Sequence, residues 1–130
     1  MRLLFVASRF PFPPLRGDQL RAWQQLRVLA RRHSVTLLAP AAPSDEAARA
    51  IDDLGLERLR TPSPGWARLA GFVAGLARGL PAQSAWPSSP ALGRRLRELL
   101  AGRRHDLVHV QLARLEPALP PRPGVPVVVD

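Results

Sequence analysis

The sequence predicts an α/β fold built on a parallel, doubly wound sheet. Short apolar runs of strand length alternate along the chain with longer segments of helical spacing, and this order favours parallel strands joined by helices. The runs are almost continuously apolar, as expected of strands that are buried on both faces. The chain has 130 residues, the size of a single domain, which can bury roughly two-thirds of its surface.

The first half of the chain predicts three strands and two helices. Leu20, Trp23, Leu26 and Ala30 share one side of the first helix. Ser44 is placed to cap the second helix, and two acidic residues follow it in the first turn, where the helix dipole favours them. In chain order we expect a strand over residues 3–7, a helix over 18–32, a strand over 34–39, a helix over 45–54 and a short strand over 56–60.

The second half predicts two helices and two further strands. Trp66, Leu69, Phe72 or Val73, and Leu76 have helical spacing. In chain order we expect a helix over residues 66–79, a proline- and serine-rich loop over 80–90, a helix over 91–104 closed by Gly102, a strand over 106–111, a proline-rich connector and a strand over 125–129. A buried parallel strand is normally followed by another helix, so we expect the sequence to be a truncated piece of a longer protein.

The composition limits the kinds of partner. There is no cysteine, which excludes disulfides and thiolate metal sites. The three histidines are dispersed and join no carboxylate cluster, so no metal is expected. The net charge is +9 and every basic residue is arginine, a bias that partly reflects codon usage. The remaining excess favours anionic partners such as phosphates or an acidic membrane face.

No segment predicts secretion or membrane spanning. The N-terminal apolar run has only about six residues, shorter than a signal-peptide core. In the most hydrophobic later segment, Arg68 and Arg78 leave nine residues between them, short of the ~20 that span a bilayer. We therefore expect a cytoplasmic protein, with peripheral contact at the inner membrane face as an open option.

The loop RFPFPPLRGDQLR, residues 9–21, joins the first strand to the first helix. In open α/β sheets, ligands bind at this carboxyl edge, and a helix start offers free N–H groups to an anion. Gly17 would let a ligand approach the backbone closely, and Asp18 is a plausible N-cap. Both residues are candidates for contact with the donor phosphates or the acceptor. The prolines would hold this geometry before the ligand arrives.

Two other interpretations of this loop are weaker. A dinucleotide-binding fingerprint needs G-x-G-x-x-G and an acidic residue after the second strand, but the strand ends at Ala39 and Pro40. Pro11, Pro14 and Arg16 fit an SH3-type ligand of polyproline form. Such patterns are common by chance, and this one lies tightly between a strand and a helix.

The first forty residues resemble the start of retaining glycosyltransferases of family 4, most closely the sugar transferases associated with exopolysaccharide and exosortase systems. Those proteins begin with an apolar strand, an arginine, an aromatic-proline run, Gly-Asp, a further arginine and a helix ending in an Arg/His-rich turn. The matching residues here are Arg9, Pro11, Phe12, Pro13, Pro14, Gly17, Asp18, Arg21 and the turn at 31–33. The blocks DLVHVQ and VPVVVD also resemble strands of that family, and the likeness is weak over residues 41–90.

The resemblance implies a GT-B fold of two Rossmann-like domains, with this chain as most of the N-terminal, acceptor-side domain. The family's donor-binding domain carries paired glutamates in an E-x7-E pattern, which the glutamates here do not match. The family histidine that faces the donor sugar would follow residues 127–129, beyond Asp130. We therefore expect no catalytic residue, cofactor or metal in this chain, and no activity of the chain alone.

The implied parent enzyme uses a nucleotide-sugar and transfers a glycosyl unit, with retention, to a hydroxyl of a saccharide or lipid-linked acceptor in cell-surface or exopolysaccharide biosynthesis. Arg9, Arg16 and Arg21 are candidates for the donor phosphates, although each could be a solvated surface charge. His109 and Gln111, near the end of a predicted strand, are candidates for acceptor contact. A histidine within a buried strand is more often a core residue than a ligand.

Five arginines lie on the predicted helix over 91–104, around a face formed by leucines. The basic side is either solvated or attracted to an acidic membrane, which would suit a lipid-linked acceptor. The alternative function is a non-enzymatic anion- or nucleic-acid-binding module. Nucleic acid is not expected, because the chain has no helix-turn-helix or RNP-like pattern and no tyrosine for stacking. The five arginines are Arg94, Arg95, Arg97, Arg103 and Arg104.

Overall fold

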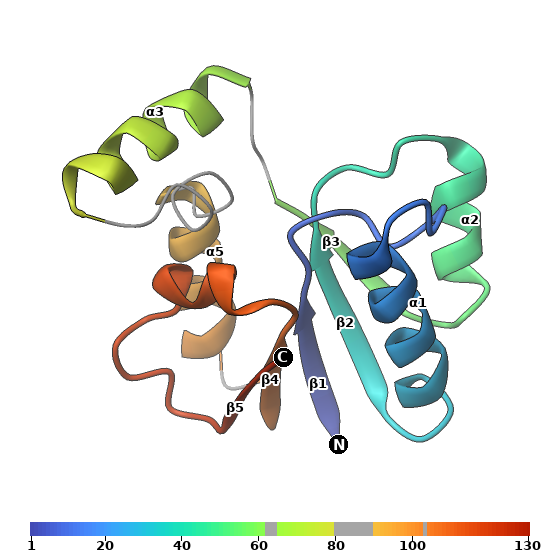
Figure 1. The fold of residues 1–130 in the computed structure, drawn as a ribbon. Helices are drawn as coiled ribbons and strands as arrows, with labels where there is room; N and C mark the ends of the chain where they lie inside the picture. The colour runs from blue at the N-terminus through green and yellow to red at the C-terminus, as the bar shows by residue number, and fades with distance from the viewer. Residues whose placement is uncertain (62–64, 80–89, 103) are drawn as a thin grey trace.

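The computed structural model describes residues 1–61, 65–79, 90–102 and 104–130, and places five strands in one parallel sheet. The strand order is β3-β2-β1-β4-β5, with β1 at the centre (Figure 1). In the register, Phe5 of β1 lies beside Leu37 of β2 and His109 of β4. The strands are β1 (Arg2–Val6), β2 (Ser34–Ala39), β3 (Glu57–Arg60), β4 (Leu107–Val110) and β5 (Val127–Val129).

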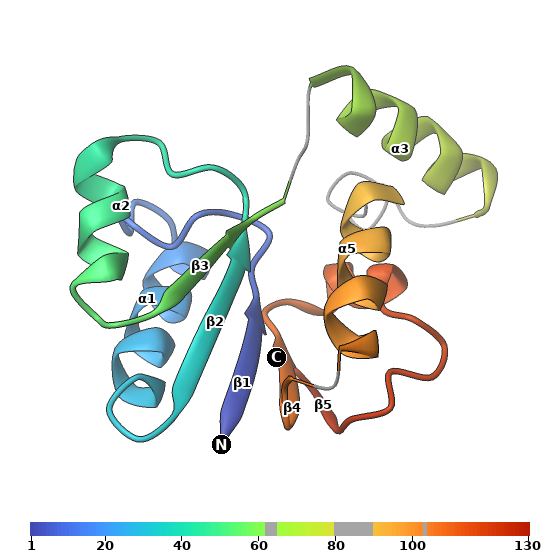
Figure 2. The ribbon, with the colours of Figure 1, turned by 180° about the vertical axis from the view of Figure 1, so that it is seen from behind.

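Helices cover both faces of the sheet, which confirms the predicted doubly wound α/β fold (Figures 1 and 2). On one face, Phe5 and Leu37 pack with Leu26 and Ile51 from two helices. On the opposite face, the alternate strand residues pack beneath a third helix and a short 3-10 helix. The helices are α1 (Gly17–Leu29), α2 (Asp45–Asp52), α3 (Gly65–Ala77), α5 (Pro90–Ala101) and the 3-10 helix η1 (Ala113–Ala118).

The predicted elements are confirmed, with ends that shift by one to three residues. The cap of α2 is as predicted, because the Ser44 hydroxyl accepts a hydrogen bond from the Ala47 amide at 3.1 Å. The prediction of the buried side of α1 is partly wrong, because Leu20 is 44% exposed and Ala22 lies in the core instead. The 3-10 helix η1 was not predicted, since its sequence ARLEPA has no helical period and contains Pro117.

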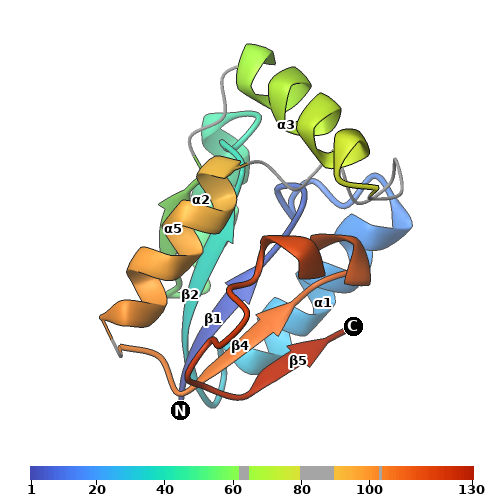
Figure 3. The same ribbon diagram turned by 90° about the vertical axis from the view of Figure 1, so that its left-hand side faces the viewer.

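The helix predicted over residues 66–79 exists as α3, but its apolar side chains do not enter the core. Leu69 and Val73 are each 58% exposed. Figure 3 shows α3 beyond the carboxyl edge of the sheet, against neither of its faces. The loop predicted over 80–90 lies almost wholly outside the described residues, as does Arg103. Among the described residues, no helix is both long and apolar enough to cross a membrane.

Candidate functional site

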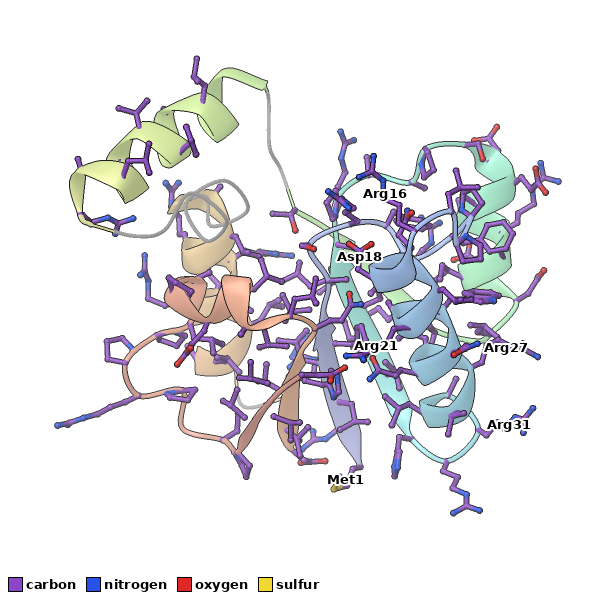
Figure 4. All side chains as sticks on the ribbon, viewed as in Figure 1. Met1, Arg16, Asp18, Arg21, Arg27 and Arg31 are labelled. Atoms are coloured by element: carbon purple, nitrogen blue, oxygen red, sulfur yellow. The ribbon has the colours of Figure 1, made fainter. Side chains whose placement is uncertain are left out.

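The sheet has its switch point between β1 and β4, because the chain leaves β1 toward β2 and later returns to pair β4 with the other edge of β1. Ligands of open α/β sheets bind where the strand order reverses, at the carboxyl ends. Here those ends lead into Ser8 and Arg9 after β1, and Gln111 and Leu112 after β4. The start of α1 lies above the same edge (Figure 4).

The loop between β1 and α1 is fixed by its own aromatic and proline residues. Phe10 is 7% exposed and Pro11 is fully buried. Phe12 packs against Trp23 of α1, with ring centroids 5.0 Å apart. The Gln19 side-chain amide donates to the Phe10 carbonyl at 2.9 Å. The side chains that interrupt the first apolar segment therefore attach the loop to the helix that follows it.

Gly17 is the first residue of α1 and opens onto free space. An added Cβ would meet no atom within 4 Å, and the Gly17 φ lies outside the left-handed region. The backbone at this position therefore does not itself require glycine. The position therefore offers open space at the start of α1, next to the positive end of the helix dipole.

Asp18 is not the N-cap that the sequence predicts. Arg16 holds that position in extended conformation and makes no side-chain capping bond, so Asp18 falls in the first turn of α1. Its Oδ2 accepts from Arg9 Nη1 at 3.2 Å. The Arg9 charge is thereby partly neutralised by Asp18, whereas Arg16 is exposed and forms no ion pair with any described residue.

Gln111 connects the end of β4 to the start of α1. It is 2% exposed, its backbone amide donates to the Val6 carbonyl at 2.9 Å, and its side-chain nitrogen donates to the Asp18 carbonyl. A buried amide held at both ends sets the spacing between the two elements. Its contact with a ligand hydroxyl stays a prediction, and the structure gives it a positioning role.

Arg21 lies one turn into α1 and is directed toward β5. Its Nη1 is 3.2 Å from Asp130 Oδ1, and Gln25 Nε2 donates to the other oxygen of the same carboxylate at 2.8 Å. Asp130 is itself held by backbone bonds to Val110 and Leu112. Arg21 therefore links α1 to the edge strand, while Arg27 lies nearer the opposite end of the helix (Figure 4).

His109 lies on the α1 face of β4 and stacks on Phe5, with centroids 4.7 Å apart and planes 6° from parallel. Burial lowers its pKa, and the Asp130 charge opposes this only in part. Its Nε2 is buried without a hydrogen-bond partner in the structure. His109 and Arg21 thus both lie near the Asp130 carboxylate, whereas Arg9 and Gln111 bond Asp18.

Two features of the switch point were missed from the sequence. The Ser8 hydroxyl is buried without a partner directly after β1, a position that the predicted strand end could have indicated. Leu112, after β4, has φ 76° and ψ 124°, a conformation that is rare for residues other than glycine. No sequence signal marks it, because leucine is not a residue that favours positive φ.

A cavity of about 520 Å³ lies beside this site, between the ends of β2 and β3 and the start of α2. Phe10, from the anchored loop, forms one wall, and residues 40–45 form another. Arg58 and Arg60 line the β3 side; Arg58 is bound to Asp52 at 2.6 Å, and Arg60 has no ion pair among the described residues. This volume is typical of pockets for small ligands.

The described residues contain no group of three or more metal-ligating side chains. No protein family, curated protein or solved structure matches the chain.

Proposed function

We propose that the chain is the acceptor-side domain of a sugar-nucleotide-dependent glycosyltransferase, which transfers a glycosyl unit with retention during synthesis of a cell-surface polysaccharide. One observation carries the proposal: at the switch point, the start of α1 lies at the carboxyl edge with free space above Gly17 and, beside it, Arg16, which forms no ion pair with a described residue. The resemblance of residues 9–40 to family 4 enzymes supports the same reaction class.

In this proposal, the start of α1 stabilises negative charge on the departing nucleoside diphosphate. The positive end of the helix dipole lies at Gly17, beside this open space. Arg16 adds a full positive charge, and Arg9 adds less because Asp18 already holds it. Groups fixed in place before charge develops are the most effective in lowering an activation barrier. Arg21 and Gln111 hold α1 at the required distance from the strands.

The cavity beside Phe10 gives a saccharide acceptor a place on the same edge of the sheet. The apolar part of its lining, which includes Phe10 and Pro40, suits the flat face of a sugar ring, and Arg60 offers hydrogen-bond donors to hydroxyl or phosphate oxygens. Phe10 lines the cavity and its loop leads to the start of α1, so donor and acceptor would lie near one another at the same edge. No residue of this chain is assigned a catalytic role.

The test uses the product of the full reading frame, assayed for transfer of labelled sugar from a panel of nucleotide-sugars to saccharide and lipid acceptors. Gly17→Val should abolish transfer with little change in melting temperature, because the side chain enters empty space that the ligand needs. Arg21→Ala should slow transfer less than Gly17→Val does, because it removes only the ion pair with Asp130 that helps to hold α1 in place. Arg27→Ala, which removes an exposed arginine from the same helix, is the matched control and should retain full activity.

The 130-residue chain alone should turn over no nucleotide-sugar. If Gly17→Val and Arg21→Ala both transfer sugar at the wild-type rate, the loop only connects β1 to α1, and the proposal is overturned. If the chain binds RNA or polyphosphate, and the full product transfers no sugar, the anion-binding module is the better assignment.

A further inference from the structure

Helix α3 presents an apolar stripe that nothing in the described structure covers. Leu69, Val73 and Leu76 lie at positions i, i+4 and i+7, which share one side of a helix. Leu69 and Val73 are each 58% exposed and Leu76 is 44% exposed, whereas Gly75 is buried and Phe72 is half-buried. The three views agree that α3 lies beyond the carboxyl edge, away from both faces of the sheet (Figures 1, 2 and 3).

The sequence around this stripe is entirely free of acidic residues. Between Glu57 and Glu98 there is no aspartate or glutamate, although the chain contains ten acidic residues elsewhere. On α5, which lies next to α3 along the chain, Arg94 and Arg97 are exposed and form no ion pair with a described residue. The same interval contains seven arginines, namely Arg58, Arg60, Arg68, Arg78, Arg94, Arg95 and Arg97.

We propose that α3 binds the surface of an anionic lipid bilayer. The stripe of Leu69, Val73 and Leu76 enters the boundary between headgroups and acyl chains, and exposed arginines of the same acid-free interval, such as Arg94 and Arg97, contact anionic headgroups. An exposed apolar stripe with cationic flanks is the pattern of helices that lie in the membrane plane. With 13 residues, α3 is too short to span the bilayer.

The charge selects a lipid surface over a second copy of the chain. Two copies docked through α3 would bring two acid-free, arginine-rich segments together, and like charges across an interface oppose association. An anionic bilayer instead gains from every arginine that approaches it. The inference does not depend on the proposed transferase activity, because vesicle binding and sugar transfer are measured separately.

The test is flotation of the 130-residue protein with vesicles of phosphatidylcholine alone or mixed with phosphatidylglycerol. The protein should float with the anionic vesicles, stay behind with the neutral ones, and detach as salt is raised, because salt screens exposed charges. The variant Leu69→Gln/Val73→Gln should bind anionic vesicles at least ten times more weakly. The variant Arg94→Gln/Arg97→Gln should bind more weakly and with a shallower salt dependence.

The matched control is Leu20→Gln/Val28→Gln, which makes the same change at two exposed apolar positions of α1. It should bind vesicles like the wild type, and all variants should unfold at the wild-type temperature. Failure to bind anionic vesicles, or undiminished binding by Leu69→Gln/Val73→Gln, overturns the proposal. A dimer in sedimentation velocity that the same variant abolishes would also overturn it, in favour of self-association.

Discussion

Helices α1 and α3 have the same length of 13 residues and were both predicted from apolar spacing, yet they end in opposite environments. Leu26 of α1 is fully buried, while Leu69 of α3 is 58% exposed, although α3 is the more apolar sequence. The difference lies in the connections. Helix α1 is the single crossover between neighbouring strands β1 and β2, so its chain ends hold it on the sheet. Helices α3 and α5 share the crossover from β3 to β4, and α5 takes the place on the sheet face.

The contrast predicts very different costs for the same truncation. Leu26→Ala should lower the free energy of unfolding by about 2–5 kcal/mol, because it leaves a cavity in a packed core. Leu69→Ala should change it by no more than about 0.5 kcal/mol, as for other exposed positions. Urea unfolding followed by far-ultraviolet circular dichroism measures both values.

The Leu26→Ala and Leu69→Ala variants also show which result would contradict the difference between α1 and α3. A loss of several kcal/mol in Leu69→Ala would mean that α3 is packed in solution, and would remove the basis for a membrane-facing stripe. Ala22→Gly is unsuitable as a control because glycine alters helix propensity in its own right. Val28→Ala, at an exposed position of α1, is the better reference and should match Leu69→Ala.

The local sequence predicted the sheet well because each strand carries its own signal. Ser34–Ala39 was predicted to the residue, since β-branched and apolar side chains fill it without interruption. The coverage of α3 was not predictable in the same way. Spacing shows that Leu69, Val73 and Leu76 share a side, but whether another element covers that side depends on contacts between distant segments.

The sequence predicted where the candidate site lies, but not which side chains bond to one another there. The position of RFPFPPLRGDQLR after the first strand located it at the carboxyl edge, as the structure has it. The partners of its side chains could not be read from the sequence: Asp18 pairs with Arg9 instead of capping α1, and Arg21 reaches Asp130, 109 residues away. The Arg21 bond exists only once the topology has brought β5 beside β4.

Two neighbouring residues on one face of the sheet also differ in burial, because Phe5 is fully buried and His109 is half-buried. The dependence of the melting temperature on pH tests this difference. Burial lowers the pKa of His109, so the unfolded chain binds a proton more readily than the folded protein. Stability should therefore fall as pH drops from about 6.5, the ordinary pKa of histidine, toward the lowered folded value. His109→Phe should reduce this pH dependence, measured as melting temperature against pH.

Some dependence should remain in that variant, because burial also lowers the pKa of His105. Removing both histidines should flatten the profile over the same window. An unchanged profile in His109→Phe would mean that the imidazole reaches water in the folded protein, which would contradict the burial of its Nε2 atom.

The smallest effect is expected at the surface, where Arg2 and Asp106 join the starts of β1 and β4. Arg2 donates to the two Asp106 carboxylate oxygens, from its backbone amide at 2.8 Å and from Nη2 at 2.9 Å. These bonds lower the pKa of Asp106 to about 2. The stability that they contribute is present above the ordinary aspartate pKa of about 3.9 and is lost as pH falls through the folded value. Exposed pairs are screened by water, so the contribution is small.

Asp106→Asn should therefore lower the melting temperature slightly at pH 7 and converge with the wild type near pH 2. Asp53→Asn, which removes an exposed carboxylate with no ion pair in the described residues, controls for the change in net charge. If the two variants have the same melting temperature at every pH, the Arg2 contact adds no stability beyond the effect of net charge, and the stability of the fold comes from its buried side chains.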